Sequence, residues 1–124
     1  MELSAEELLF FEGHAGVLPL YLQARERLFQ IAPGARIEVK KTQITFRLRR
    51  TFAVVSFLPV RRAAERPADY LTLSFGLPYA PESTCIDAAV QTGPRRWTCH
   101  TLISRVQELT PLLPCLEQAK LLAK

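Results

Sequence analysis

Hydrophobic residues recur with helical spacing at both ends of this chain and with a period of two between them. Ser4 and Glu7 form a capping-box pattern, which predicts a short helix that ends at Gly13. A second helix is predicted over 16–32, before a Pro-Gly pair that would end it. A third is predicted over 110–123, where apolar residues again follow helical spacing, with Pro114 as an alternative start of its regular part. The residues on one stripe of the second helix are Leu18, Tyr21, Leu22, Arg25, Leu28, Phe29 and Ala32.

The central part of the chain alternates between apolar and polar residues, as strands do. Ile37 and Val39 share one parity, whereas Ile44 and Phe46 share the other. A phase change of this kind moves side chains to the opposite face of a strand. The residues 40–43 are therefore predicted to form a turn or a bulge instead of continuing one long strand.

Further strands are predicted at 44–48, 52–58, 70–75 and 97–103, with a weaker strand signal at 85–90. The segment 52–58 is almost continuously apolar, which is typical of a central strand covered on both faces. Strands that follow one another through short connections usually pair as antiparallel neighbours. The pattern therefore predicts an antiparallel meander.

Length and composition fit one domain spanning 1–124. The chain has 124 residues, of which 48% are hydrophobic and 23% are charged, and this is enough to bury a core. We predict a two-layer α+β domain with a meander sheet of four to five strands. Two N-terminal helices and one C-terminal helix are expected to pack on one face of that sheet.

Positive charge is concentrated in residues 36–66. This segment holds nine of the sixteen Lys and Arg residues but two of the twelve acidic ones, so nine minus two gives +7. Such a surface attracts anionic partners, and one hypothesis is a nucleic-acid-associated accessory protein. The alternative is a solvated edge strand whose charges oppose aggregation, since no aromatic platform for bases is evident. The arginines concerned are Arg47, Arg49, Arg50, Arg61 and Arg62, with Arg66 following them.

The cysteines do not predict a disulfide framework or a zinc ribbon, because Cys85, Cys99 and Cys115 are odd in number and lack C-x-x-C spacing. Cys99 and His100 are adjacent on a predicted strand, so they point to opposite faces and cannot easily share a metal ion. We therefore expect no metal and no cofactor. Acidic residues near the N-terminus and the lack of a long apolar run favour a cytoplasmic protein with reduced thiols.

Lys41 and Gln43 lie at the phase change, where a turn or bulge can direct both side chains toward one pocket. An ammonium and an amide could then hold a small anionic or amide-bearing ligand. The alternative is that Thr42 and Gln43 make local turn hydrogen bonds while Lys41 is solvated. His100 is expected to form hydrogen bonds, either to a ligand or within the fold.

These residues favour a non-enzymatic ligand-binding or interaction module, which would bind a small anionic ligand or a protein partner. The candidate ligand-binding residues are Lys41, Gln43, Arg47, Tyr70 and His100. No catalytic residues are assigned, because catalytic triads are spatial and cannot be recognised from spacing alone. A small hydrolase or transferase is a third class, for which the sequence offers no motif.

Several blocks of the chain occur in the order typical of one bacterial family. They are Phe10-Phe11-Glu12-Gly13, Lys41-Thr42-Gln43-Ile44-Thr45-Phe46, Asp69-Tyr70-Leu71-Thr72-Leu73 with Phe75-Gly76-Leu77, and Arg96-Trp97 with His100. In these blocks the chain resembles the domain-of-unknown-function family numbered 5655. The resemblance implies a compact α+β fold and polar motif positions at Lys41, Gln43 and His100. It also implies a second histidine before His100, where this chain has Cys99.

Overall fold

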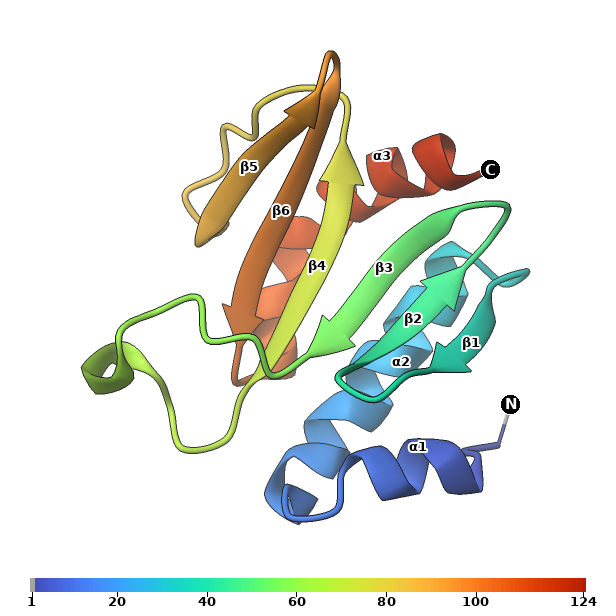
Figure 1. Cartoon of the computed structure of the whole chain (residues 1–124), viewed down its shortest axis with the longest axis vertical. Coiled ribbons are helices and arrows are strands. Elements are labelled where there is room, and N and C mark those ends of the chain that lie inside the picture. Colours follow the sequence, from blue (N-terminus) through green and yellow to red (C-terminus); the bar gives the residue numbers. More distant parts are fainter. Residues whose placement is uncertain (1) are drawn as a thin grey trace.

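One open antiparallel sheet of six strands forms the centre of the computed structural model, which describes residues 2–124 (Figure 1). The strands are β1 (Arg36–Val39), β2 (Gln43–Arg47), β3 (Thr51–Ser56), β4 (Leu71–Leu77), β5 (Ala88–Gly93) and β6 (Arg96–Ile103). The α-helices of the described residues are α1 (Ala5–Phe10), α2 (Leu18–Ile31) and α3 (Leu113–Ala123). Short 3-10 segments lie at Ala15–Val17, Ala63–Glu65 and Val106–Leu112.

The strand order across the sheet is β1-β2-β3-β4-β6-β5. The predicted α+β class is confirmed, but the predicted four to five strands are wrong, and the sheet is not a simple meander because β6 lies between β4 and β5. The two edge strands account for the difference in number. β1 has four residues, and β5 (sequence AAVQTG) contains one large apolar residue. The strand signal is therefore short in β1, where the alternation covers only Ile37 and Val39, and weak in β5.

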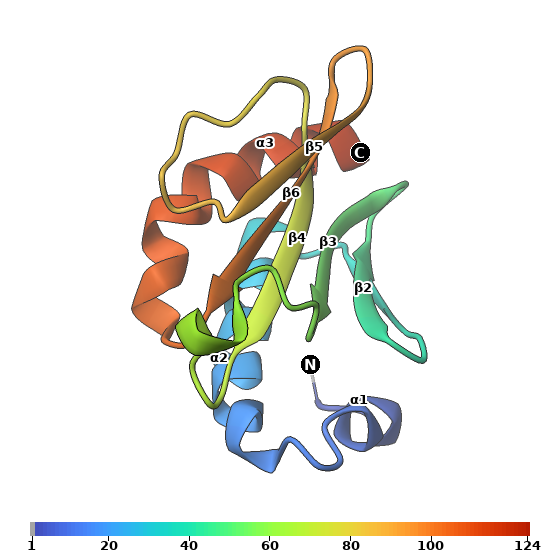
Figure 2. The ribbon, with the colours of Figure 1, turned by 60° about the vertical axis from the view of Figure 1, so that its left-hand side comes forward.

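The helices α2 and α3 cover one face of the sheet and lie behind it in Figure 1, and Figure 2 shows them beside the sheet. Strand residues on that face are apolar and buried, and they form one cluster with residues of the helices. Burial of each large apolar side chain stabilises the fold by about 1.5–3 kcal/mol. Members of this cluster include Tyr21, Leu28, Ile44, Phe46, Val55, Leu73, Phe75, Cys99 and Leu116.

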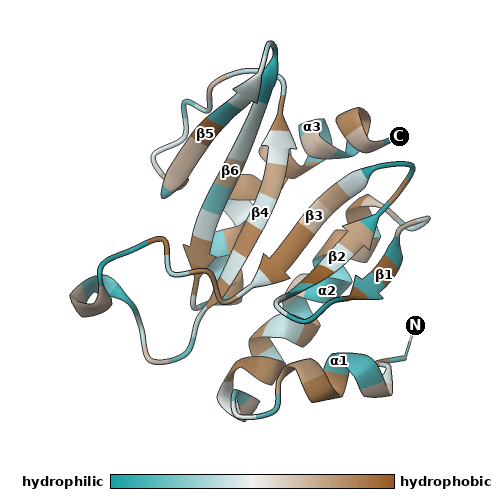
Figure 3. Cartoon of the chain, viewed as in Figure 1, coloured by the Kyte–Doolittle hydropathy of each residue, from teal (hydrophilic) through white to brown (hydrophobic). Residues whose placement is uncertain are grey.

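The opposite face of the sheet is largely polar where β2, β3, β4 and β6 meet. Gln43 pairs with Ser56, Val54 with Ser74, and Ser74 with His100. Paired residues of antiparallel strands point to the same face, and Figure 3 shows pale and teal segments interrupting the brown strands. β3 is central, as predicted, but helices cover only one of its faces. On the other face, Val54 and Ser56 line a cavity.

A buried ion pair joins α1 to α2. Glu7 is only 1% exposed, and its carboxylate accepts a hydrogen bond from Nε of Arg25 at 2.8 Å and another from the Tyr21 hydroxyl. The predicted capping box is also present, because Ser4 and Glu7 hydrogen-bond to each other's backbone N–H groups. Sequence analysis identified Glu7 as a capping residue but missed its role as the buried partner of Arg25.

The C-terminal element is divided into two parts, and its regular helix begins beside Pro114. Residues 106–112 form a 3-10 segment, and the regular helix α3 begins at Leu113. Two prolines explain this start: Pro111 lies inside the 3-10 segment, and Pro114 falls in the first turn of α3, where its missing N–H costs no hydrogen bond. Among the helices in residues 2–124, none combines the length and the apolar character needed to cross a lipid bilayer.

Candidate functional site

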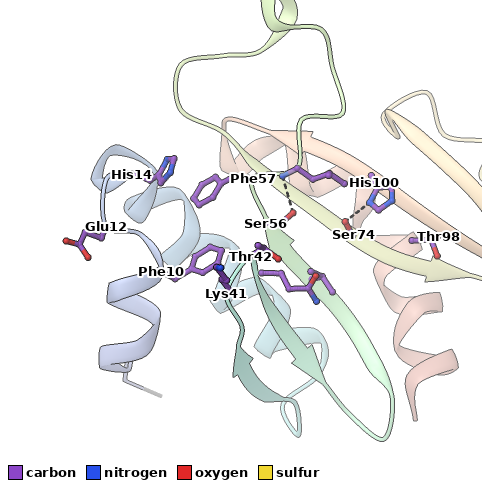
Figure 4. A pocket seen from close by; sticks show the side chains of 13 residues that line it. Phe10, Glu12, His14, Lys41, Thr42, Ser56, Phe57, Ser74, Thr98 and His100 are labelled. Atoms are coloured by element: carbon purple, nitrogen blue, oxygen red, sulfur yellow. Dashed lines mark hydrogen bonds between the residues drawn. The ribbon is translucent and has the colours of Figure 1, made fainter.

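A cavity of about 660 Å³ opens on the polar face of the sheet (Figure 4). Its walls come from the connection after α1, the β1–β2 turn, the end of β3, and the strands β4 and β6. These segments are distant in sequence, and the order of the strands brings them together. The lining residues are Phe10, Glu12, His14, Lys41, Thr42, Gln43, Val54, Ser56, Phe57, Leu58, Ser74, Thr98 and His100.

The β1–β2 turn places Lys41 and Gln43 at this cavity. The backbone N–H of Lys40 donates to the Gln43 carbonyl at 2.8 Å and closes the hairpin, so the phase change in the sequence is a turn. The Gln43 side-chain nitrogen donates to Oγ1 of Thr45 at 3.0 Å. This bond fixes the amide, and the amide oxygen is left without a hydrogen-bond donor among residues 2–124. The ammonium group of Lys41 belongs to an exposed side chain at the cavity mouth.

His100 contacts Ser74 on the floor of the cavity. The two residues are direct cross-strand partners on β4 and β6, and Oγ of Ser74 lies 2.7 Å from Nδ1 of His100. Burial lowers the pKa of the imidazole below its ordinary value, which keeps the ring neutral at pH 7. Nε2 forms no hydrogen bond with residues 2–124. When the Ser74 hydroxyl donates to Nδ1, Nε2 carries the proton and can donate it to a ligand.

Three stacked rings form the other end of the cavity. Phe57 stacks on His14 with ring centroids 4.1 Å apart and on Phe10 with centroids 5.5 Å apart, at interplanar angles of 18° and 11°. Figure 4 shows Phe57 between the other two rings. Sequence analysis did not assign these residues to the site. Phe10 could have been identified from its place in the first family-like block. No such signal existed for His14 and Phe57, which only the tertiary structure brings together.

The structure brings three of the five candidate ligand-binding residues to one cavity: Lys41, Gln43 and His100. Arg47 does not line it and lies at the far end of β2, beside a β-bulge. Tyr70 also lies outside the lining, but its ring meets Phe57 edge-on and its hydroxyl donates to the Phe57 carbonyl at 3.0 Å. Tyr70 therefore supports the aromatic wall from behind.

Comparison with known proteins identifies the family. Residues 8–121 match a family described as a domain of unknown function, DUF5655. The chain belongs to the DUF5655 family. This confirms the resemblance found in the sequence blocks and covers nearly the whole chain. Searches of curated proteins and of solved structures gave no match.

In this DUF5655 domain, position 99 does not contribute to the cavity. Cys99 is fully buried in the core on the face opposite His100, and burial raises the pKa of its thiol to about 11. A histidine at this position would point into the core and away from the pocket. In residues 2–124, no group of three or more His, Cys, Asp and Glu side chains is arranged to hold a metal ion.

The arginines of residues 36–66 do not form one surface in this DUF5655 domain. Arg49 and Arg50 precede β3, whereas Arg61 and Arg62 follow it, so six strand residues of about 3.3 Å each separate the two groups (Figure 1). Arg61 is also engaged internally, with Nε 2.8 Å from Asp87 and a further bond to the Leu102 carbonyl. A single patch that combines both groups is therefore not present.

Proposed function

We propose that this DUF5655 domain binds a small ligand in the cavity on the polar face of its sheet. The supporting observation is that Lys41, Gln43 and His100 come from separate segments and line the same cavity of about 660 Å³. Ligand sites are typically concave and largely apolar, with a few convergent polar groups that fix orientation. This cavity has that composition, with Phe10, Val54, Phe57 and Leu58 among its apolar residues.

The polar groups define what the ligand should carry. Lys41 offers positive charge at the mouth, the Gln43 amide oxygen can accept a hydrogen bond, and Nε2 of His100 can donate one. A ligand with an amide, or with a carboxylate beside a donor group, would satisfy all three. The stacked rings would pack against its apolar or aromatic part.

A hydrolase is the second candidate, because the 2.7 Å contact between Ser74 and His100 resembles a nucleophile with its base. The sheet register provides a simpler explanation, since the two residues are direct cross-strand partners. In addition, no carboxylate of residues 2–124 hydrogen-bonds to Nε2 to orient the ring. Labelling with a fluorophosphonate probe tests this candidate: modification of wild-type protein that is lost in Ser74→Ala would establish the hydrolase.

The alternative function is nucleic-acid binding. It would rely on Arg47, Arg49 and Arg50, because Arg61 and Arg62 lie beyond β3. It predicts oligonucleotide binding that weakens steeply as salt increases. It also predicts that Arg47→Ala combined with Arg49→Ala reduces binding. Absence of binding at low salt would remove this alternative.

The ligand proposal is tested by titrating ¹⁵N-labelled protein with a library of small amide and carboxylate compounds. We expect saturable chemical-shift changes at the amides of Gln43, Ser74 and His100. Gln43→Ala should weaken these responses, whereas Gln107→Ala, which changes an exposed glutamine outside the cavity, should not. Responses that cluster elsewhere, or that Gln107→Ala weakens equally, would contradict the proposal.

A further inference from the structure

A second cavity, of about 400 Å³, adjoins the first on the polar face. The two cavities share Val54, Ser74 and Thr98 in their walls, and the two together are called the groove below. One end of this groove is the ring stack around Phe57. The other end lies between the β2–β3 turn and the β5–β6 turn, near the end of α3 at Leu122.

The second end of the groove is strongly basic. Arg50 comes from the β2–β3 turn, Arg95 and Arg96 come from the β5–β6 turn, and no acidic residue lines this cavity. The ion pairs within residues 2–124 involve Arg25 and Arg61, so none of these three arginines is neutralised by a carboxylate. The β2–β3 turn is held in place, because the Arg50 N–H donates to the Ala123 carbonyl at 2.8 Å.

The backbone at Arg95 has a conformation that is unfavourable for arginine. Gly93 pairs with Arg96, which leaves Pro94 and Arg95 as a two-residue hairpin loop. Proline holds its own φ negative, and the positive φ of the loop, 56°, falls at Arg95. Glycine or asparagine is preferred at such a position, because a side chain there clashes with the following carbonyl. Arginine is therefore a costly choice for the turn, and backbone strain of this kind often accompanies function.

We propose that Arg50, Arg95 and Arg96 bind the anionic group, a phosphate or a carboxylate, of an elongated amphipathic ligand. The inference rests on the proposed function, because the apolar part of that ligand would occupy the first cavity. Guanidinium groups suit such oxyanions, to which they donate paired hydrogen bonds. From Phe57 to Thr51 the groove follows β3 for six residue steps, or about 20 Å, so it can accept a ligand with an extended chain.

The anionic subsite is tested with pyrophosphate as the probe, by NMR titration of the ¹⁵N-labelled full chain. We expect saturable shifts at the amides of Thr51, Arg95 and Arg96. Arg95→Gly should weaken binding about five-fold, as expected for one exposed charge contact. Because glycine relieves the positive φ, the same variant should melt at or above the wild-type temperature. Arg62→Ala removes the same charge from an exposed site beyond β3 and should leave binding unchanged.

Three results would overturn the subsite. They are unsaturable pyrophosphate shifts, equal weakening by Arg62→Ala, or a lower melting temperature for Arg95→Gly, which would make Arg95 a structural residue. Arg96→Ala provides a second variant, for which we also expect weaker binding without unfolding.

A second titration separates this proposal from the one on which it rests. Octyl phosphate and octanoate should both shift the amide resonances of Arg95 and His100. Whichever compound binds more tightly shows whether the subsite prefers phosphate or carboxylate. Octanol, which has no charge, should bind more weakly than either. Shifts at His100 alone would overturn the anionic subsite and leave the first cavity as a ligand site. Shifts at Arg95 alone would leave the subsite and contradict the ligand proposal for the first cavity.

Discussion

The carboxylate of Glu7 and the guanidinium of Arg25 form an ion pair of 2.8 Å in which both side chains are less than 10% exposed, at 2% and 8%. Arg25 also donates from Nη2 to the Glu2 carbonyl at 3.0 Å. The pair joins α1 to α2. The end of α1 supplies Phe10 to the cavity, and the connection between the two helices supplies His14. A capping residue at the start of a short helix thus determines where one wall of the candidate site lies.

Replacing Glu7 by glutamine should lower the free energy of unfolding by about 3 kcal/mol, because it leaves the Arg25 charge buried without its partner. Urea denaturation followed by circular dichroism measures this change. Glu6→Gln is the matched control, since Glu6 is exposed on the same helix turn and should change stability by less than about 0.5 kcal/mol. Similar losses in both variants would show that the ion pair is not responsible.

Stability should also fall in acid because of Glu7. Burial by itself would raise the pKa of this carboxyl, but hydrogen bonds from Arg25, Tyr21 and Ser4 outweigh it, and the pKa is lowered. A carboxyl with a lowered pKa contributes its full stabilisation above the unfolded-state pKa of about 4.3. That contribution is lost as the pH falls through the folded-state value. Unfolding free energies measured from pH 6 downward should therefore decline more steeply for wild type than for Glu7→Gln, and parallel curves would contradict the assignment.

His100 should titrate below the ordinary histidine value of about 6.5, since burial lowers its pKa. Proton NMR of the imidazole resonances against pH measures this directly. The unfolded chain then binds the proton more readily than the folded one, so the contribution of His100 to stability declines as the pH falls from about 6.5 to its folded-state pKa. His100→Gln should remove this part of the pH dependence. A titration midpoint at or above the ordinary value would show that the ring is not desolvated.

Arg61 should stabilise the loop after β3 through Asp87. The side chains are 28% and 19% exposed, so Arg61→Ala is expected to cost about 1 kcal/mol, near the upper end for a surface pair. Asp87→Ala should cost more, because Asp87 also accepts the Leu102 N–H at 2.7 Å. Arg62→Ala, at the exposed neighbouring arginine, should have no measurable effect. Thermal unfolding of the three variants distinguishes these roles, and equal effects at Arg61 and Arg62 would contradict the structural assignment of Arg61.

The sequence by itself determined the α+β class, the helix starts at Ser4 and after Gly16, and the position of the β1–β2 turn. These features depend on residues close together in the chain: a capping box needs two side chains three positions apart, and a hairpin shows as a reversal of apolar parity. For the same reason, the sequence indicated that Lys41 and Gln43 could point toward one pocket.

Only the tertiary structure decided that His100 lines the same cavity as Lys41 and Gln43. His100 reaches the cavity because β6, and not β5, is the strand that lies next to β4 in the sheet. This strand order depends on packing between distant segments. The pairing of Glu7 with Arg25 has the same origin. Local patterns specify which face of an element is apolar, whereas the neighbours of each polar side chain depend on how the elements pack, and so the site could not be assembled from the sequence alone.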